Sequence, residues 1–265
     1  MRHWPLHVAP LIAMTALVAP MPAHAGDDRA FEVLVFSRTT GFRHESIAAG
    51  QTLIQTLGDA HGFAVTLTED PASFTPKGLA GFAVVVFLNT TGSVLDSAGK
   101  AAFEAWLRAG GGYVGVHSAA DTEYDWPFYG ELIGGHAWFH SHPAIQTARI
   151  DVERGDDPAV RHLPAHVDIE DEWYNFRANP RPVVDVLLRL DEQSYAPGDG
   201  AMGVDHPIAW KRTIDAGRSF YTGLGHRIET YLDPRFRRHM LGGLVWAAGD
   251  GVLSAGFEPT RPAMR

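Results

Sequence analysis

The chain has 265 residues, of which 31 are acidic and 22 basic, and its formal net charge is −9 at pH 7. Lysine occurs only at Lys77, Lys100 and Lys211, so the chain lacks the basic surface that nucleic-acid binding requires, and we expect no nucleic-acid partner. It contains no cysteine, which excludes disulfides and a thiol nucleophile.

The N-terminus has the pattern of a secretory signal. Arg2 supplies a positive charge, residues 6–18 are mostly apolar, and Ala23-His24-Ala25 forms a small-x-small cleavage site. We therefore predict a signal peptide over residues 1–25 and a secreted protein, periplasmic in a Gram-negative host. The apolar run is too short for a membrane span, and no later segment approaches that length. Residues 26–265 are expected to form a single domain of unspecified oligomeric state.

Strands and helices alternate in the first half of the chain. The segment 82–88 is apolar on both faces, which is typical of a central parallel strand. The fold predicted from this order is α/β and flavodoxin-like, with a central, mostly parallel sheet flanked by helices. The predicted strands are 31–36, 63–68, 82–88 and 113–117, and the predicted helices are 46–61 and a segment capped by Asp96.

The second half is richer in strands and ends in a helix. That helix, 234–248, begins with proline and is followed by Gly249. No repeat or low-complexity linker divides the chain. The predicted strands are 145–152, 166–174, 183–190, 207–211 and 218–224.

The strand at 113–117 ends on a histidine among small residues, Gly115-Val116-His117-Ser118. Ligands of open α/β sheets bind at the carboxyl ends of strands, and a tight turn of small residues displays one side chain there. Without cysteine, the displayed His117 is expected to transfer protons or bind a metal. Asp121, in the same turn, is a candidate for substrate binding.

Residues 134–143 bring together three further histidines, His136, His140 and His142. A glycine-rich loop of this kind can present imidazoles to a metal or an anion. The spacing matches no standard zinc signature, and a solvated loop with aromatic anchors is the alternative.

Acidic residues are concentrated in the predicted strand 166–174. Strand alternation would place Asp168, Glu170 and Glu172 on one face and Asp171 on the other. A carboxylate beside Tyr174 suits a general base, a metal ligand or an acceptor for a sugar hydroxyl. A solvated acidic face is the plainer interpretation.

Two adjacent strands near the C-terminus carry the remaining candidates. One begins with His206-Pro207 and contains Trp210, and the other leads through Gly223 and Gly225 to His226. His226 repeats the pattern of His117, in which an apolar strand and small residues precede a histidine.

Together these motifs resemble the ThuA-like (trehalose utilisation) family over about residues 31–248. The segments that carry the resemblance are 40–44, 115–118, 171–174, 206–210 and 220–226. The resemblance implies a fold like that of class I glutamine amidotransferases, with His117 where those enzymes have cysteine. It also implies a role in the catabolism of trehalose and related sugars through 3-keto-glycosides.

We therefore predict a carbohydrate-active enzyme that cleaves 3-keto-glycosides by elimination or hydrolysis. A C3 ketone acidifies the proton at C2, which a base can remove. The base is assigned to His117 or Glu172, with His44 close to the substrate. The residues assigned to substrate binding are Arg43, Asp121, His136, Tyr174, His206 and Trp210. The alternative is a non-catalytic sugar-binding module of the same fold, in which Trp138, Trp173 and Trp210 stack on sugars.

A divalent metal, with zinc the first choice, is expected at His117, Glu172 and His226. Each of these residues lies near the end of a predicted strand, so all three can meet at one edge of the sheet. His142 or His44 is the expected substitute or additional ligand. The alternative is that these residues bind the sugar directly, without a metal.

Overall fold

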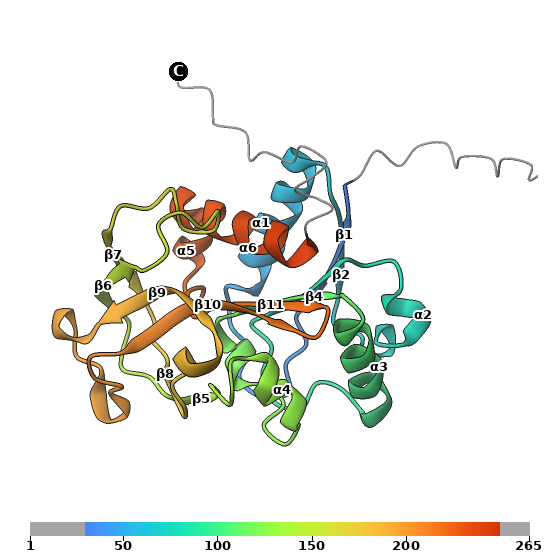
Figure 1. Ribbon diagram of the computed structural model, residues 1–265, viewed down its shortest axis with the longest axis horizontal. Coiled ribbons are helices and arrows are strands. Elements are labelled where there is room, and N and C mark those ends of the chain that lie inside the picture. Colours follow the sequence, from blue (N-terminus) through green and yellow to red (C-terminus); the bar gives the residue numbers. More distant parts are fainter. Residues whose placement is uncertain (1–29, 250–265) are drawn as a thin grey trace, which may run out of the picture.

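The computed structural model describes residues 30–249, so the predicted signal peptide at 1–25 lies outside the described residues. Its core is a nine-stranded sheet in the order β2-β1-β3-β4-β11-β10-β9-β6-β7 (Figure 1). The strands of this sheet are β1 (Glu32–Phe36), β2 (Ala64–Thr68), β3 (Val84–Leu88), β4 (Gly112–Val116), β6 (Gln146–Val152), β7 (His166–Asp171), β9 (Asp185–Asp191), β10 (His206–Ile214) and β11 (Gly217–Thr222).

One half of the sheet is parallel. Strands β2, β1, β3, β4 and β11 pair in parallel, with Leu34 opposite Val85 and Val114 opposite Phe220. Every residue of β3 is buried, as the apolar run at 82–88 predicts for a central strand. The predicted α/β fold with a central sheet flanked by helices is confirmed.

The other half is antiparallel. Strands β10, β9, β6 and β7 extend the sheet from β11, each antiparallel to its neighbour. A separate two-stranded sheet pairs β5 (Phe139–Ser141) with β8 (Asn175–Phe176). In the β-rich second half of the chain, only β11 continues the parallel sheet; the other four strands add antiparallel pairs to the edge that β11 would otherwise leave unpaired.

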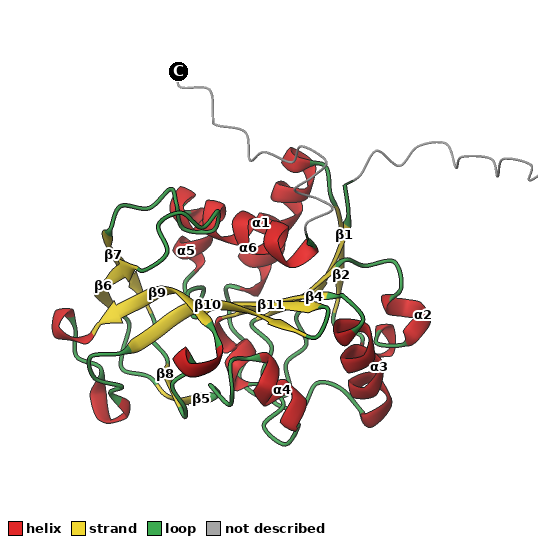
Figure 2. Ribbon diagram, viewed as in Figure 1, coloured by secondary structure: helices red, strands yellow, loops and turns green. Residues whose placement is uncertain are grey.

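Helices cover both faces of the sheet (Figure 2). Helices α1, α5 and α6 pack together on one face, and α3 and α4 lie on the other. Asp96 caps α3 through the N–H of Gly99 (2.7 Å), and Asp233 caps α6 through the N–H of Arg235 (2.7 Å). The helices are α1 (Ile47–His61), α2 (Pro76–Leu79), α3 (Ser97–Arg108), α4 (Pro127–Leu132), α5 (Ile228–Leu232) and α6 (Pro234–Ala248). None of the helices within residues 30–249 is long and apolar enough to cross a membrane.

Strand β7 is shorter than the sequence predicts, and this changes the direction of one key side chain. The strand ends at Asp171, with Asp168 and Glu170 exposed and Asp171 buried. Alternation therefore holds up to Asp171, but Glu172 lies beyond the strand and is buried as well. The expectation that Glu172 shares the solvated face of Asp168 is wrong, because the chain leaves the strand geometry before residue 172.

Helix α6 packs so closely against β4 that a methyl group added at Gly112 would clash with it. A Cβ built on Gly112, the first residue of β4, would lie 2.2 Å from the backbone oxygen of Ala247 in α6. We predict that Gly112→Ala lowers the free energy of unfolding by about 1–3 kcal/mol, the usual cost of overpacking, measured by urea titration. Gly155→Ala, whose Cβ would have no neighbour within 4 Å, is the control. Equal stability of the two variants would contradict this packing.

Candidate metal and catalytic site

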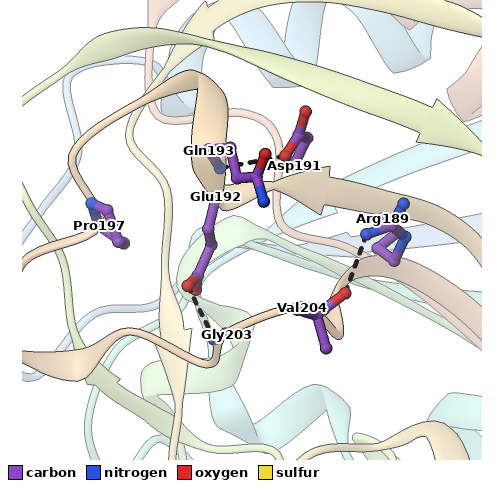
Figure 3. Close-up of a pocket in the computed structure, with 7 residues that line it drawn as sticks. All are labelled: Arg189, Asp191, Glu192, Gln193, Pro197, Gly203 and Val204. Atoms are coloured by element: carbon purple, nitrogen blue, oxygen red, sulfur yellow. Dashed lines mark hydrogen bonds between the residues drawn. The ribbon is translucent and has the colours of Figure 1, made fainter.

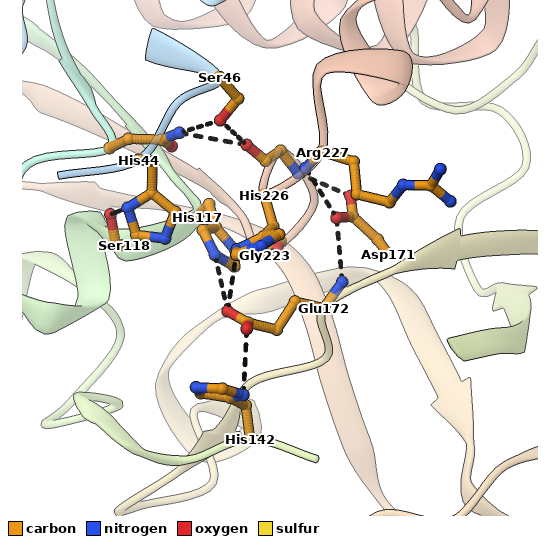
Figure 4. A network of polar contacts seen from close by, with 12 residues as sticks. His44, Ser46, His117, Ser118, His142, Asp171, Glu172, Gly223, His226 and Arg227 are labelled. Carbon is orange, nitrogen blue, oxygen red and sulfur yellow. Dashed lines mark hydrogen bonds and ion pairs between the residues drawn. The ribbon is translucent and has the colours of Figure 1, made fainter. Parts of the chain in front are cut away.

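Four side chains converge at the carboxyl edge of the parallel half of the sheet (Figure 4). Among residues 30–249, His44, His117, Glu172 and His226 each offer one ligand atom, and these atoms all lie within 4.8 Å of one another. His44 follows β1, His117 follows β4 and His226 follows β11, so three parallel strands deliver three imidazoles. Glu172 comes from the antiparallel half, directly after β7. The structure thus brings together the three residues for which a metal was predicted, and adds His44.

The backbone fixes His117 in one orientation and one tautomer. Its φ of +48° lies in the left-handed region that residues with a Cβ rarely adopt, and its carbonyl accepts a hydrogen bond from the Tyr221 hydroxyl (2.8 Å). Its Nδ1–H donates to the carbonyl of Gly223 (2.9 Å). In the neutral ring the lone pair is then on Nε2, which points to Glu172 Oε2 at 3.3 Å.

His226 approaches the same carboxylate oxygen. Its Nδ1 lies 3.1 Å from Glu172 Oε2, and neither this nitrogen nor His117 Nε2 makes a hydrogen bond, although both are buried. Nitrogen lone pairs aimed at a carboxylate oxygen repel it unless a proton or a cation lies between them. Three imidazoles and one carboxylate form a donor set that suits a divalent transition metal.

The electrostatics keep the carboxylate ionised and His44 neutral. Burial alone would raise the pKa of Glu172, but the neighbouring imidazoles of His117 and His226 outweigh it and lower that pKa. Burial, followed by the nearby imidazoles of His117 and His226, lowers the pKa of His44 to about 3. For His226, contact with Glu172 outweighs burial, and its pKa is raised. Glu172 therefore stays ionised and the ring of His44 stays neutral, which are the states in which these two groups bind a metal.

His142 stands on the other side of Glu172. Its Nδ1 lies 3.1 Å from Glu172 Oε1 and 2.9 Å from the carbonyl of Pro143, so two acceptors place the proton on Nδ1. The lone pair is then on Nε2, on a side chain that is 42% exposed. His142 was a candidate metal ligand, but the structure places it outside the group of four, at the opposite end of the network from His44 (Figure 4).

Asp171 holds the two halves of the cluster in place. Its fully buried carboxylate accepts the N–H groups of Gly225 (2.9 Å), Arg227 (3.2 Å) and Glu172 (3.0 Å), and the hydroxyl of Thr230 (2.9 Å). One side chain thus fixes the backbone of Glu172 and both residues that flank His226 (Figure 4). Asp171 was not among the predicted site residues, although alternation along the strand placed it on the face opposite Asp168 and Glu170.

Two predicted substrate-binding residues prove to be internal. Trp210 is fully buried and stacks on Tyr221 with ring centroids 4.5 Å apart, a position that gives its predicted role in substrate binding no support. His206 is also fully buried, with Nδ1 2.8 Å from Glu192 and Nε2 2.9 Å from the carbonyl of Tyr174. With both ring nitrogens engaged, His206 supports the chain around Tyr174 and does not face a substrate.

Three other residues predicted to bind substrate make different contacts: one pairs with a carboxylate, one packs on the cluster and one lies apart from it. Arg43 makes a bidentate pair with Glu69 (3.1 and 2.7 Å), and Tyr174 packs on the ring of His117 with centroids 4.2 Å apart. His136 is exposed and packs on Trp138 (5.2 Å), apart from the group of four.

Asp121 is half-buried and accepts a hydrogen bond from the Tyr124 hydroxyl (2.5 Å). Burial raises the pKa of its carboxyl. A carboxyl of this kind can accept or donate a hydrogen bond to a substrate hydroxyl.

A separate cavity of about 270 Å³ lies beside the end of β9 (Figure 3). Its charged groups are already engaged: Arg189 donates to the carbonyl of Val204 (2.9 Å), and Glu192 accepts the N–H of Gly203 (2.7 Å). None of the four clustered residues lines it. This cavity therefore lacks the reactive groups that the His–Glu cluster provides.

A family model and two solved structures place this chain among the same group of proteins. Residues 32–247 match the family described as trehalose utilisation, ThuA. A ThuA-like protein of Bacteroides uniformis is 25% identical, with a TM-score of 0.72 over 88% of this chain and 99% of that one. A ThuA-like protein of Parabacteroides merdae is 20% identical, with a TM-score of 0.67 over 82% and 90% of the two chains.

More distant structures share only the fold. A β-galactosidase from Bacillus circulans sp. alkalophilus is 14% identical, with a TM-score of 0.52 over 87% of this chain and 32% of that one. No curated protein matches the chain significantly.

The role of Asp171 leads to a testable expectation. In Asp171→Asn, one acceptor oxygen becomes an NH₂ group that faces backbone N–H donors in a buried site. We predict a loss of about 1–3 kcal/mol in the free energy of unfolding, measured by urea titration. Asp168→Asn, on the same strand with a side chain that is 66% exposed, is the matched control and should be neutral. Equal stability of the two variants would show that the carboxylate does not organise the site.

Proposed function

This chain belongs to the trehalose utilisation (ThuA) family, and from this premise we propose that it cleaves 3-keto-glycosides related to trehalose, by elimination or hydrolysis. Family membership associates the chain with carbohydrate metabolism. The observation that carries the proposal is the convergence of His44, His117, Glu172 and His226 at the carboxyl edge of the sheet, with His142 beside them. Such a set of donors and bases suits the removal of a proton next to a carbonyl group.

A divalent metal, zinc in the first instance, fits the cluster. His117 Nε2, His226 Nδ1 and Glu172 Oε2 would be ligands, because the two nitrogens are buried without hydrogen bonds and face that oxygen. His44 would be the additional ligand. When bound there, such an ion supplies Lewis acidity that stabilises negative charge developing on a carbonyl oxygen.

The proton acceptor is then His142, because His117 and Glu172 are occupied as ligands. Glu172 and the carbonyl of Pro143 hold the proton on Nδ1 of His142 and leave Nε2 basic. The pairing of an imidazole with a carboxylate orients the ring and stabilises the imidazolium that forms when it takes up a proton. This revises the prediction from sequence, which gave the base to His117 or Glu172.

The elimination can be written with every proton accounted for. His142 Nε2 takes the proton from C2, and the C–H electron pair forms a double bond between C1 and C2 by way of the enolate of the C3 ketone. The bond between C1 and the glycosidic oxygen breaks, and that oxygen leaves with the electron pair. The imidazolium returns its proton to the departing oxygen. Addition of water to the resulting enone would give the product of hydrolysis.

The alternative of a non-catalytic sugar-binding module finds less support. It depends on Trp138, Trp173 and Trp210 as stacking surfaces, and these side chains are 8%, 0% and 0% exposed. Buried indoles cannot stack on a sugar in solution, so this alternative loses the feature that suggested it.

Removal of a proposed ligand should remove the metal. We predict that His117→Ala loses bound metal and activity together, because a lost ligand should cost more than the roughly 10–100-fold in affinity that outer-shell changes cost. Metal content would be measured by mass spectrometry of protein purified without chelator. His166→Ala, an exposed histidine that pairs with Asp151, is the control and should retain the metal. Full occupancy in His117→Ala would remove His117 from the ligand set.

Turnover tests the reaction itself. We predict that the protein consumes 3-keto-trehalose but not trehalose, that a chelator abolishes the reaction and that zinc restores it. His142→Ala should lower kcat by about 10²–10⁴-fold, the usual contribution of a general base. His140→Ala, at an exposed position of β5 two residues before His142, should match the wild type. If neither sugar is turned over with any divalent metal, the proposed reaction is wrong.

A further inference from the structure

One aromatic side chain stands in solvent next to the cluster. Phe42 is 65% exposed, whereas every other phenylalanine within residues 30–249 is buried or partly buried. What distinguishes this ring is its position: it packs on His44 of the cluster and keeps most of its apolar surface open, so a ligand that extends from the cluster would cover it.

The backbone that carries this ring is held firmly. The carbonyl of Phe42 accepts a hydrogen bond from the Thr91 hydroxyl (2.8 Å), and the N–H of Gly41 donates to the same hydroxyl oxygen (3.3 Å). The N–H of Thr40 donates to the Thr91 carbonyl (2.9 Å). Because Thr91 is fully buried, the segment before His44 is anchored to the protein interior. A ring on such a segment loses little conformational freedom when a ligand stacks on it.

The ring also lies where a substrate would extend beyond the reacting centre. It meets His44 edge to face, with centroids 4.8 Å apart and an interplanar angle of 84°. His44 in turn lies 4.9 Å from His117 and 5.1 Å from His226, again between ring centroids. The ring of His44 therefore lies between Phe42 and the other two histidines of the cluster. This separation is about the width of one sugar unit.

The chemistry around the ring selects a neutral ligand. Arg43, the nearest cation in sequence, has both terminal nitrogens on the carboxylate of Glu69, so its charge is already balanced. A phenyl ring offers no hydrogen bond to a phosphate or carboxylate, but it packs well against an apolar surface. A pyranose presents such a surface on the face where its axial C–H groups point.

We infer that Phe42 is a stacking platform for the second sugar ring of the substrate, the one that does not react. The inference rests on the proposed function for the identity of the ligand, and it names the residue that would favour disaccharides over monosaccharides. Phe42 makes this contact equally in the ground state and the transition state. Its loss should therefore raise KM and leave kcat nearly unchanged.

Binding of unreacted trehalose, measured by calorimetry or ligand-observed NMR, tests the inference without requiring turnover. Phe42→Ala should weaken trehalose binding about 5- to 10-fold, the scale of an aromatic contact, and leave glucose binding unchanged. Phe42→Trp should preserve or strengthen trehalose binding. Leu232→Ala removes a side chain that is 68% exposed, at the end of α5, and serves as the matched control; all variants should melt at the wild-type temperature.

The possible failures are distinguishable. Wild-type affinity for trehalose in Phe42→Ala would overturn the platform and leave the proposed reaction standing. Binding that depends on Phe42 in a protein that turns over no keto-sugar would support the platform and overturn the reaction. A wild-type protein that binds no trehalose would overturn the platform, and one that also turns over no 3-keto-trehalose would overturn both. A loss of trehalose affinity equal to that of Leu232→Ala would also reject the platform.

Discussion

The buried carboxylate of Asp171 is the interaction on which the site depends. Glu172 and His226 are far apart in the sequence and come from opposite halves of the sheet, so nothing in the local chain brings them together. Asp171 does so by accepting four hydrogen bonds at once, three from backbone N–H groups next to or within these residues. The carbonyl of Gly225 is held from the other side by Ser46, Asn89 and Tyr231. His226 therefore follows a residue, Gly225, whose N–H and carbonyl are both held by hydrogen bonds.

Within that frame, the arrangement of protons gives the cluster its chemistry. The carbonyl of Gly223 holds the proton of His117 on Nδ1, and burial keeps His44 neutral, so lone pairs converge on a carboxylate that stays ionised. The arrangement is unfavourable for the protein alone and favourable around a cation, which is why the structure supports a metal proposal. Stored strain points the same way, since His117 keeps a left-handed backbone conformation at the centre of the site.

Much of this could be predicted from the sequence, for reasons that also explain the errors. The parallel half follows from apolar runs separated by helical patterns, and residues at strand ends must meet at one edge, so His117, Glu172 and His226 could be identified. The antiparallel order of the second half could not, because hydrophobic alternation does not specify which strands pair. The burial of Trp210 and His206 could not be predicted either, because the side chains that surround a strand residue are not visible in its own segment. Asp171 was overlooked because its importance lies in two backbone N–H groups and one threonine hydroxyl that are 54 to 59 residues away.

The junction at β11, where parallel pairing gives way to antiparallel pairing, has a consequence for how the protein folds. His44 and His117 belong to one side of that junction, Glu172 to the other, and His226 follows the junction strand itself. The cluster is therefore complete only when segments far apart in the sequence have docked on one another, and such non-local contacts are typical of slowly folding proteins. A ligand held by all four residues of the cluster would bind the folded protein and not the unfolded chain. Its binding would therefore raise the free energy of unfolding of the whole sheet.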